Sequence, residues 1–128
     1  MFWKATSFNQ DVSSWTTSSV TRMTGMFAES AFNQPLTLWD VSNVQDLQGM
    51  FEGASDFNQD LSSWKVGRVV DFGGMFAGAT SFNQSLCSWG AFLSNTSLAN
   101  TARMLRMHSA LPKQCLSILQ VAPRVPFA

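Results

Sequence analysis

Apolar residues in this chain recur at short, irregular intervals, most often three apart, with glycine and serine between them. In the stretch 57–81 they stand at Leu61, Trp64, Val66, Val69, Phe72, Met75 and Phe76. This spacing matches neither the strict alternation of a half-buried strand nor the sustained 3.6-residue period of an amphipathic helix. The regularity lies instead between distant segments, because the same pattern returns further along the chain.

A phrase that begins Phe-Asn-Gln and ends in Trp occurs four times, with starts 24, 25 and 25 residues apart. A Met-Phe pair recurs in step, at Met1, Met26, Met50 and Met75. The phrase supplies three columns of equivalent residues: Phe8, Phe32, Phe57 and Phe82; Asn9, Asn33, Asn58 and Asn83; Trp15, Trp39, Trp64 and Trp89. A fixed period of this length is typical of a solenoid, in which each turn stacks on the next.

The aligned columns predict two short strands in each turn, at 61–64 and 68–72 in the third repeat. Such strands pair with their equivalents in neighbouring turns at about 4.8 Å. Gly25, Gly49 and Gly74 predict a tight bend before each Met-Phe pair, and the five residues from 75 to 79 predict one helical or 3₁₀ turn. The fold expected is therefore mainly β with short helical or 3₁₀ turns.

Three regions follow from the repeat. We expect the solenoid, of about four turns of 24–25 residues, over 1–90. A divergent last turn and C-terminal cap should occupy 91–120, because terminal repeats are altered to cover the open end of the core. Residues 121–128, with Pro123 and Pro126, should form an extended tail.

The repeated aromatic and amide residues are interpreted as structure rather than as a binding site. Eleven Phe and five Trp supply most of the volume available for a core, and nearly all of them belong to the repeat. An inward Asn in every turn can bond to backbone amides and to the Asn above and below it. We therefore predict a structural ladder of these columns, although a polar binding row is the alternative.

The phrases Phe-Asn-Gln-x-Leu-x-x-Trp and Val-x-x-Val-x-x-Met-x-Gly-Met-Phe resemble those of the BspA-like leucine-rich-repeat surface proteins. The resemblance covers residues 1 to about 90. It implies a leucine-rich-repeat-like solenoid that serves adhesion or protein binding and has no catalytic residues. No site residue is carried over, because this family is characterised by repeat positions and not by an active-site motif.

Charge and hydropathy exclude two classes of partner. Eight basic and eight acidic side chains give a formal net charge of +0, and charged residues make up only 12% of the chain. The acids all lie within 1–80, whereas 81–128 has no acid and four bases: Arg103, Arg106, Lys113 and Arg124. Four scattered cations are too few for a nucleic-acid footprint. No apolar run reaches the roughly 18 to 20 residues that span a bilayer, so we expect no direct membrane span.

Motifs for catalysis, metal binding and nucleotide binding are missing from the sequence. His108 is the only histidine, and no nucleophile motif surrounds it. Zinc-ligand spacing and a phosphate-binding loop are also missing. Stacked Asp11 and Asp60 suggest a shared calcium ion, but Pro35 and Ser85 interrupt their column. We therefore expect no enzyme activity, no metal and no cofactor.

Cys87 and Cys115 are the only two cysteines. In register, Leu116 lies one turn from Cys87, so Cys115 is close enough for a disulfide. The alternative is two free thiols in a reducing compartment. A disulfide indicates an extracellular, cell-surface or oxidising luminal location. Asn95 begins a glycosylation sequon, and the second sequon, at Asn83, is set aside because we place Asn83 in the buried ladder.

Two functions are consistent with the sequence. The first is a non-enzymatic protein-protein interaction or adhesion module of a surface or secreted repeat protein. The second is a structural or linker subunit held permanently in a larger, possibly membrane-attached assembly, and the apolar start Met1-Phe2-Trp3 and the apolar tail favour it. An open first turn would present Phe2, Phe8 and Trp15, so we expect upstream repeats or a partner to cover it. The partner protein itself is not identified by the sequence.

Overall fold

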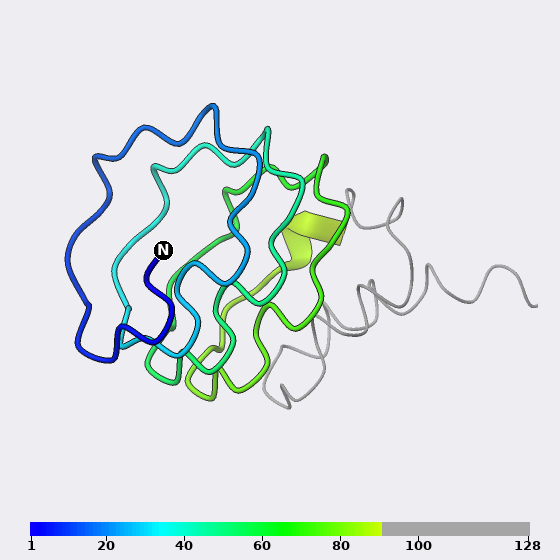
Figure 1. Cartoon of the computed structure of the whole chain (residues 1–128). Coiled ribbons are helices and arrows are strands. Elements are labelled where there is room, and N and C mark those ends of the chain that lie inside the picture. The colour runs from blue at the N-terminus through cyan, green and yellow to red at the C-terminus, as the bar shows by residue number, and fades with distance from the viewer. Residues whose placement is uncertain (91–128) are drawn as a thin grey trace, which may run out of the picture.

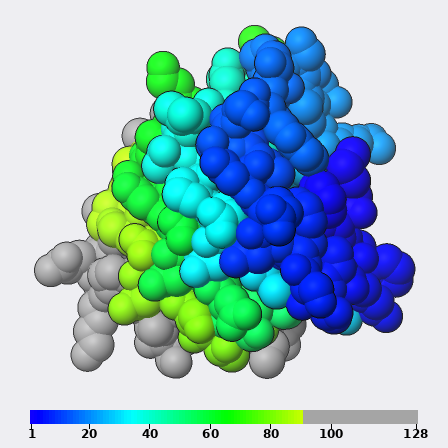
Figure 2. Space-filling view, turned by 90° about the vertical axis from the view of Figure 1, so that its left-hand side faces the viewer, coloured from blue at the N-terminus to red at the C-terminus, as the bar shows by residue number. Residues whose placement is uncertain are grey.

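The computed structural model describes residues 1–90. Their backbone winds through successive turns that lie side by side (Figure 1). In the space-filling view the same turns form adjacent bands, with the first turn at one end (Figure 2). Hydrogen bonds between residues 23 to 28 positions apart join each turn to the next.

The expected mainly β, leucine-rich-repeat-like solenoid is wrong for these 90 residues. Their only regular element is the 3₁₀ helix η1, Cys87–Trp89. No strand is formed within them, and two isolated parallel bridges join Arg22 to Asp46 and Asp46 to Asp71. The strands expected at 61–64 and 68–72 are absent, and the expected helical segment at 75–79 consists of turns.

The alternating use of backbone amides explains why stacked turns do not become a sheet here. Four N–H groups of one turn donate to carbonyls of the next at 2.7 to 2.9 Å, those of Met23, Gly25, Phe27 and Glu29. The N–H groups of Met26 and Ala28 instead donate to carbonyls three residues earlier in their own turn, at 3.2 and 3.1 Å. Such bonds are typical of β-turns, whereas a ladder requires extended backbone in both strands.

The glycine before each Met-Phe pair makes this turning backbone possible. Gly25, Gly49 and Gly74 have φ values of +59°, +60° and +65°. A residue without a Cβ adopts this left-handed region at no steric cost. The tight bend predicted at these glycines is therefore present, but it belongs to a row of turns rather than to the end of a strand.

Stacked aromatic rings form the interior. Within a turn, the ring centroids of Phe51 and Phe57 are 3.8 Å apart, and between turns those of Phe27 and Phe51 are 5.8 Å apart. Phe32, Phe57 and Phe82 are fully buried. Burying a large aromatic side chain contributes about 1.5 to 3 kcal/mol, so this stack is the main source of stability in a fold without regular elements.

The Trp column is tied to the backbone as well as packed. The indole N–H groups of Trp39, Trp64 and Trp89 each donate at 3.0 Å to a carbonyl of the preceding turn, those of Val12, Leu36 and Leu61. These three rings are at most 4% exposed, whereas Trp15 in the first turn is 40% exposed. The Trp column is therefore buried in the later turns and exposed to solvent at the first turn. The predicted cap at 91–120 and tail at 121–128 lie outside the described residues.

Candidate functional site

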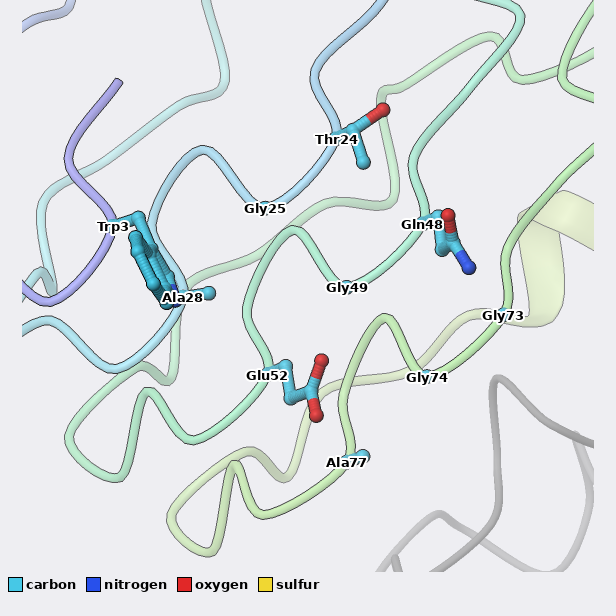
Figure 3. A pocket seen from close by; sticks show the side chains of 10 residues that line it. All are labelled: Trp3, Thr24, Gly25, Ala28, Gln48, Gly49, Glu52, Gly73, Gly74 and Ala77. Carbon is cyan, nitrogen blue, oxygen red and sulfur yellow. The ribbon is translucent and has the colours of Figure 1, made fainter.

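A shallow groove runs across four turns on one side of the stack, with a volume of about 480 Å³. Three columns of equivalent residues line it: Trp3, Ala28, Glu52 and Ala77; Thr24, Gln48 and Gly73; Gly25, Gly49 and Gly74. We call it the side groove. Figure 3 shows Trp3 beside Ala28 at one end, with Gln48 and Glu52 on the third of the four turns. The groove draws residues from four successive turns of the described part.

The floor of the side groove is backbone, because its central column is glycine. A Cβ added at Gly25 would have no heavy atom within 4 Å, so the space above it is open. A Cβ at Gly49 would lie 3.0 Å from Glu52 Oε2, so this carboxylate leans over the floor. The N–H groups of Gly25 and Gly49 donate to Gln48 and Gly73 at 2.8 and 2.9 Å. The floor is therefore open over Gly25 and covered at Gly49, which is buried, and the amides of both glycines are already used.

Side chains with free polar groups stand around this floor. Thr24, Gln48 and Glu52 are exposed, and their side chains form no hydrogen bond within residues 1–90. Trp3 is 61% exposed, and Lys4 Nζ lies 4.6 Å from the centroid of its ring. One aromatic ring, one amide, one hydroxyl and one carboxylate are thus available to a ligand.

A second cavity, of about 660 Å³, lies at the first turn. Its apolar lining consists of Met1, Trp15, Val20, Met23, Met26 and Trp39. Met1 is 86% exposed. We call this the first-turn cavity. Of the three side chains expected to lie open at this turn, Trp15 is the most exposed, while Phe2 and Phe8 are half-buried and stack on each other with centroids 3.8 Å apart.

The asparagine ladder lies on the surface and not in the core. The N–H of Asn33 donates to Asn9 Oδ1 at 2.8 Å, and that of Asn58 donates to Asn33 Oδ1 at 2.9 Å. The same contact joins Asn83 to Asn58. The side-chain amide of the following Gln reinforces each step, as in Gln59 Nε2 to Asn33 Oδ1 at 2.9 Å. The Oδ1 atoms of Asn9, Asn33 and Asn58 are therefore occupied by structure, although Asn9, Asn58 and Asn83 are exposed.

The aspartates are used in local turns. Asp11, Asp40 and Asp60 each accept an N–H from the serine two residues later, at 2.8, 3.0 and 2.8 Å. The backbone of Ser13 lowers the pKa of Asp11 below its ordinary value, and the hydroxyls of Ser42 and Ser62 lower the pKa of Asp40 and Asp60. Within 1–90 no three His, Cys, Asp or Glu side chains gather as a possible metal site.

Four residues singled out in the sequence fall at or beyond the edge of the described part. Cys87 belongs to η1 and is not a free thiol. Cys115, Asn95 and His108 lie outside the described residues. The Cys87–Cys115 disulfide and glycosylation at Asn95 therefore stay predictions. Asn83, set aside as buried, is exposed, so its sequon cannot be dismissed on the ground of burial.

The repeated columns of the sequence do not indicate the side groove. Its characteristic column changes from turn to turn, as Trp3, Ala28, Glu52 and Ala77. A position that keeps its place in the repeat but not its residue type is typical of an outward face. That variation was the signal available in the sequence.

Comparisons with known proteins add one family. A family model described as a Mycoplasma protein of unknown function, DUF285, matches residues 1–116. No curated protein and no solved structure matches the chain. Among the described residues, no helix is long and apolar enough to cross a membrane.

Proposed function

The chain belongs to the DUF285 family of Mycoplasma proteins of unknown function, and since that family has no activity to transfer, we propose a function from the geometry. We propose that this protein is a non-enzymatic interaction or adhesion module of a surface or secreted protein. It binds another protein along the side of its stacked turns. The side groove is the observation that carries the proposal.

Three properties of the groove support binding rather than catalysis. It spans several turns, so an extended ligand can contact equivalent positions one after another. Its polar groups at Thr24, Gln48 and Glu52 are not used by the fold, and such groups fix the orientation of a ligand. Its single carboxylate has no histidine, cysteine or second carboxylate beside it in the lining, so the acid-base pairs of common hydrolases are not assembled there.

A variant that fills the groove tests this proposal. Gln48→Trp places a large side chain over the floor without removing a side-chain hydrogen bond of the described residues. Gln45→Trp is the matched control, because Gln45 is exposed on the same turn and does not line the groove. The immobilised chain should retain a defined set of proteins from its native source. We expect Gln48→Trp to lose them and Gln45→Trp to keep them, and equal retention by both variants contradicts the proposal.

The first-turn cavity favours a second candidate, a structural subunit held in a larger assembly. Exposed Met1 and half-exposed Trp15 adjoin an apolar cavity there, and contiguous exposed apolar surface is typical of interaction sites. Light scattering after size-exclusion chromatography separates the two candidates. A free module is monodisperse when purified alone, whereas an assembly subunit aggregates or is recovered only with its partners.

A further inference from the structure

The outward column of the side groove contains a notch between two large side chains. Trp3 and Glu52 occupy equivalent positions two turns apart, and Ala28 is the residue between them. Ala28 is 4% exposed and Trp3 lies beside it (Figure 3), so its methyl group is covered, and the open space lies on the side of Trp3 that faces Gly25 and Glu52. Figure 3 shows Trp3 and Glu52 on separate turns of the groove, with Ala28 on the turn between them, and both line the same 480 Å³ volume.

The lining of the side groove is negatively charged. Glu52 is the only charged residue in the groove lining, and no ion pair to it is formed within the described residues. The surrounding stretch 1–80 has eight acidic and four basic side chains. A ligand group that enters the notch therefore gains from a positive charge and not from a negative one.

The aromatic wall favours the same sign of charge. The face of an exposed indole attracts ammonium and guanidinium groups. Lys4 Nζ lies 4.6 Å from the Trp3 ring centroid, so a ligand cation replaces Lys4 there or uses the other face of the ring. The methylene stem of a lysine or arginine can also pack along the ring while its charged head stays polar. Trp3 thus suits both parts of a long basic side chain.

We propose that the notch binds a lysine or arginine side chain from an extended basic segment of the partner protein. The charged head pairs with Glu52, and the stem packs along Trp3 on the side that faces Glu52. Gln48 and Thr24 contact the flanking polar groups of the segment. Strand addition does not contribute, because the N–H groups of Gly25 and Gly49 are bonded between turns. This inference rests on the proposed function and names its partner class.

Two pentapeptides test the inference directly. The probe is acetyl-Gly-Lys-Gly-Lys-Gly-amide, and the comparison replaces both lysines with norleucine, which keeps the stem and removes the charge. Tryptophan fluorescence or chemical-shift titration of the full chain measures binding. We expect the norleucine peptide to bind at least about tenfold more weakly, since a charge-assisted contact is lost. Binding of the lysine peptide should also weaken when the salt concentration rises from about 0.05 to 0.5 M.

Three variants locate the site. Glu52→Gln should weaken the lysine peptide about fivefold or more, and Trp3→Ala by a similar factor. Glu29→Gln is the matched control: it removes the same charge from another exposed glutamate that does not line the groove. We expect it to leave the affinity unchanged. Circular dichroism of each variant checks that the fold is retained.

Several outcomes overturn the inference. These are no binding of the lysine peptide at millimolar concentration, equal binding of the norleucine peptide, or equal losses in Glu52→Gln and Glu29→Gln. Preferential binding of a neutral oligosaccharide such as cellohexaose at Trp3 also overturns it. If Gln48→Trp abolishes retention of native proteins while Glu52→Gln does not, the proposed function holds and only the basic partner is wrong. If neither variant affects retention, both fail.

Discussion

Backbone conformation decides what many single positions in this protein tolerate. Lys4, Glu29, Gly53 and Gly78 occupy equivalent places in four turns, and their φ values lie between +53° and +74°. Two of the four are not glycine, so the column accepts a side chain in the left-handed region where there is space. The cost of a side chain at such a position is about 1 to 2 kcal/mol, and crowding by neighbours adds to it.

Gly78→Ala should therefore destabilise the protein more than Gly25→Ala. At Gly25 an added Cβ meets nothing within 4 Å, so only the backbone cost of about 1 kcal/mol applies. At Gly78 the added Cβ lies 3.3 and 3.4 Å from the Cα and N of Gly53, which are backbone atoms and cannot rotate away. We expect about 1 kcal/mol or more of additional loss. Urea denaturation of both variants measures this, and equal losses would show that neighbouring turns do not crowd Gly78.

Aspartates at turn positions make the free energy of unfolding depend on pH in the acidic range. Hydrogen bonds from Ser13, Ser42 and Ser62 lower the pKa of Asp11, Asp40 and Asp60 below their ordinary value of 3.8. A carboxyl with a lowered pKa in the folded state stabilises the fold above 3.8, and this contribution is lost as pH falls through the lowered pKa. Stability should thus decrease below about pH 4.

The combined variant Asp11→Asn, Asp40→Asn and Asp60→Asn checks this origin, because an amide does not titrate. Denaturant midpoints measured between about pH 5 and 2.5 should change less in the variant than in the unaltered chain. All three carboxyls are at the surface, so the difference should be small. An unchanged pH profile would show that these turns do not contribute.

At the scale of elements, side chains take over part of the role that a sheet would have. Asn58 Oδ1 accepts the N–H of Asn83 at 2.9 Å and the side-chain amide of Gln84 at 3.0 Å. One asparagine thus joins two turns at a place where no backbone-to-backbone bond does so. The ladder can form at the surface because the stacking of the turns, and not the pairing of strands, sets the distance between successive asparagines.

Asn58→Ala should accordingly destabilise the protein by about 1 to 2 kcal/mol, since two donors lose their acceptor. Asn58→Asp keeps an oxygen at Oδ1 and should cost clearly less. Guanidinium denaturation of the two variants compares them. If both substitutions cost the same, the amide nitrogen of Asn58 matters and the two bonds to Oδ1 do not explain the ladder.

The element scale also shows what the sequence can and cannot predict. Equivalent residues stack because the period is fixed, so the buried places of Phe57 and Trp64 follow from the repeat alone. The presence of strands does not follow from the repeat. Equivalent residues align in columns in the sequence whether the backbone of the stacked turns is extended or turned. Here it is turned, since Met26 and Ala28 donate their N–H groups within their own turn. The sequence does not assign Glu52 and Trp3 to a groove. The floor of the groove is formed by glycines with positive φ values, and from the sequence these glycines predict only a tight bend.

At the scale of the whole molecule, each turn depends on its two neighbours. Rings of Phe32, Phe57 and Phe82 stack at 6.3 and 5.9 Å, so a gap in the middle turn removes contacts on both sides. Phe57 is fully buried. A stack of this kind has a continuous core that no single turn can complete alone.

Phe57→Ala should cost about 3 to 5 kcal/mol, the usual loss for a large aromatic cavity. Leu38→Ala is the control, because Leu38 is 77% exposed, and it should change the free energy of unfolding by less than about 0.5 kcal/mol. Denaturant melts of both variants give the two values. A loss below about 1 kcal/mol for Phe57→Ala would mean that the aromatic column does not hold the turns together.

The backbone-to-backbone hydrogen bonds between turns have a preferred direction. Met23, Gly25, Phe27 and Glu29 donate forward to the next turn, and among the backbone-to-backbone bonds only that of Gln45 runs back across the same interface. The asparagine ladder and the Trp column have the opposite direction, since Asn33 and Trp39 donate back to the preceding turn. Only a turn added in the same orientation continues both sets of bonds, so copies or further turns extend this stack head to tail.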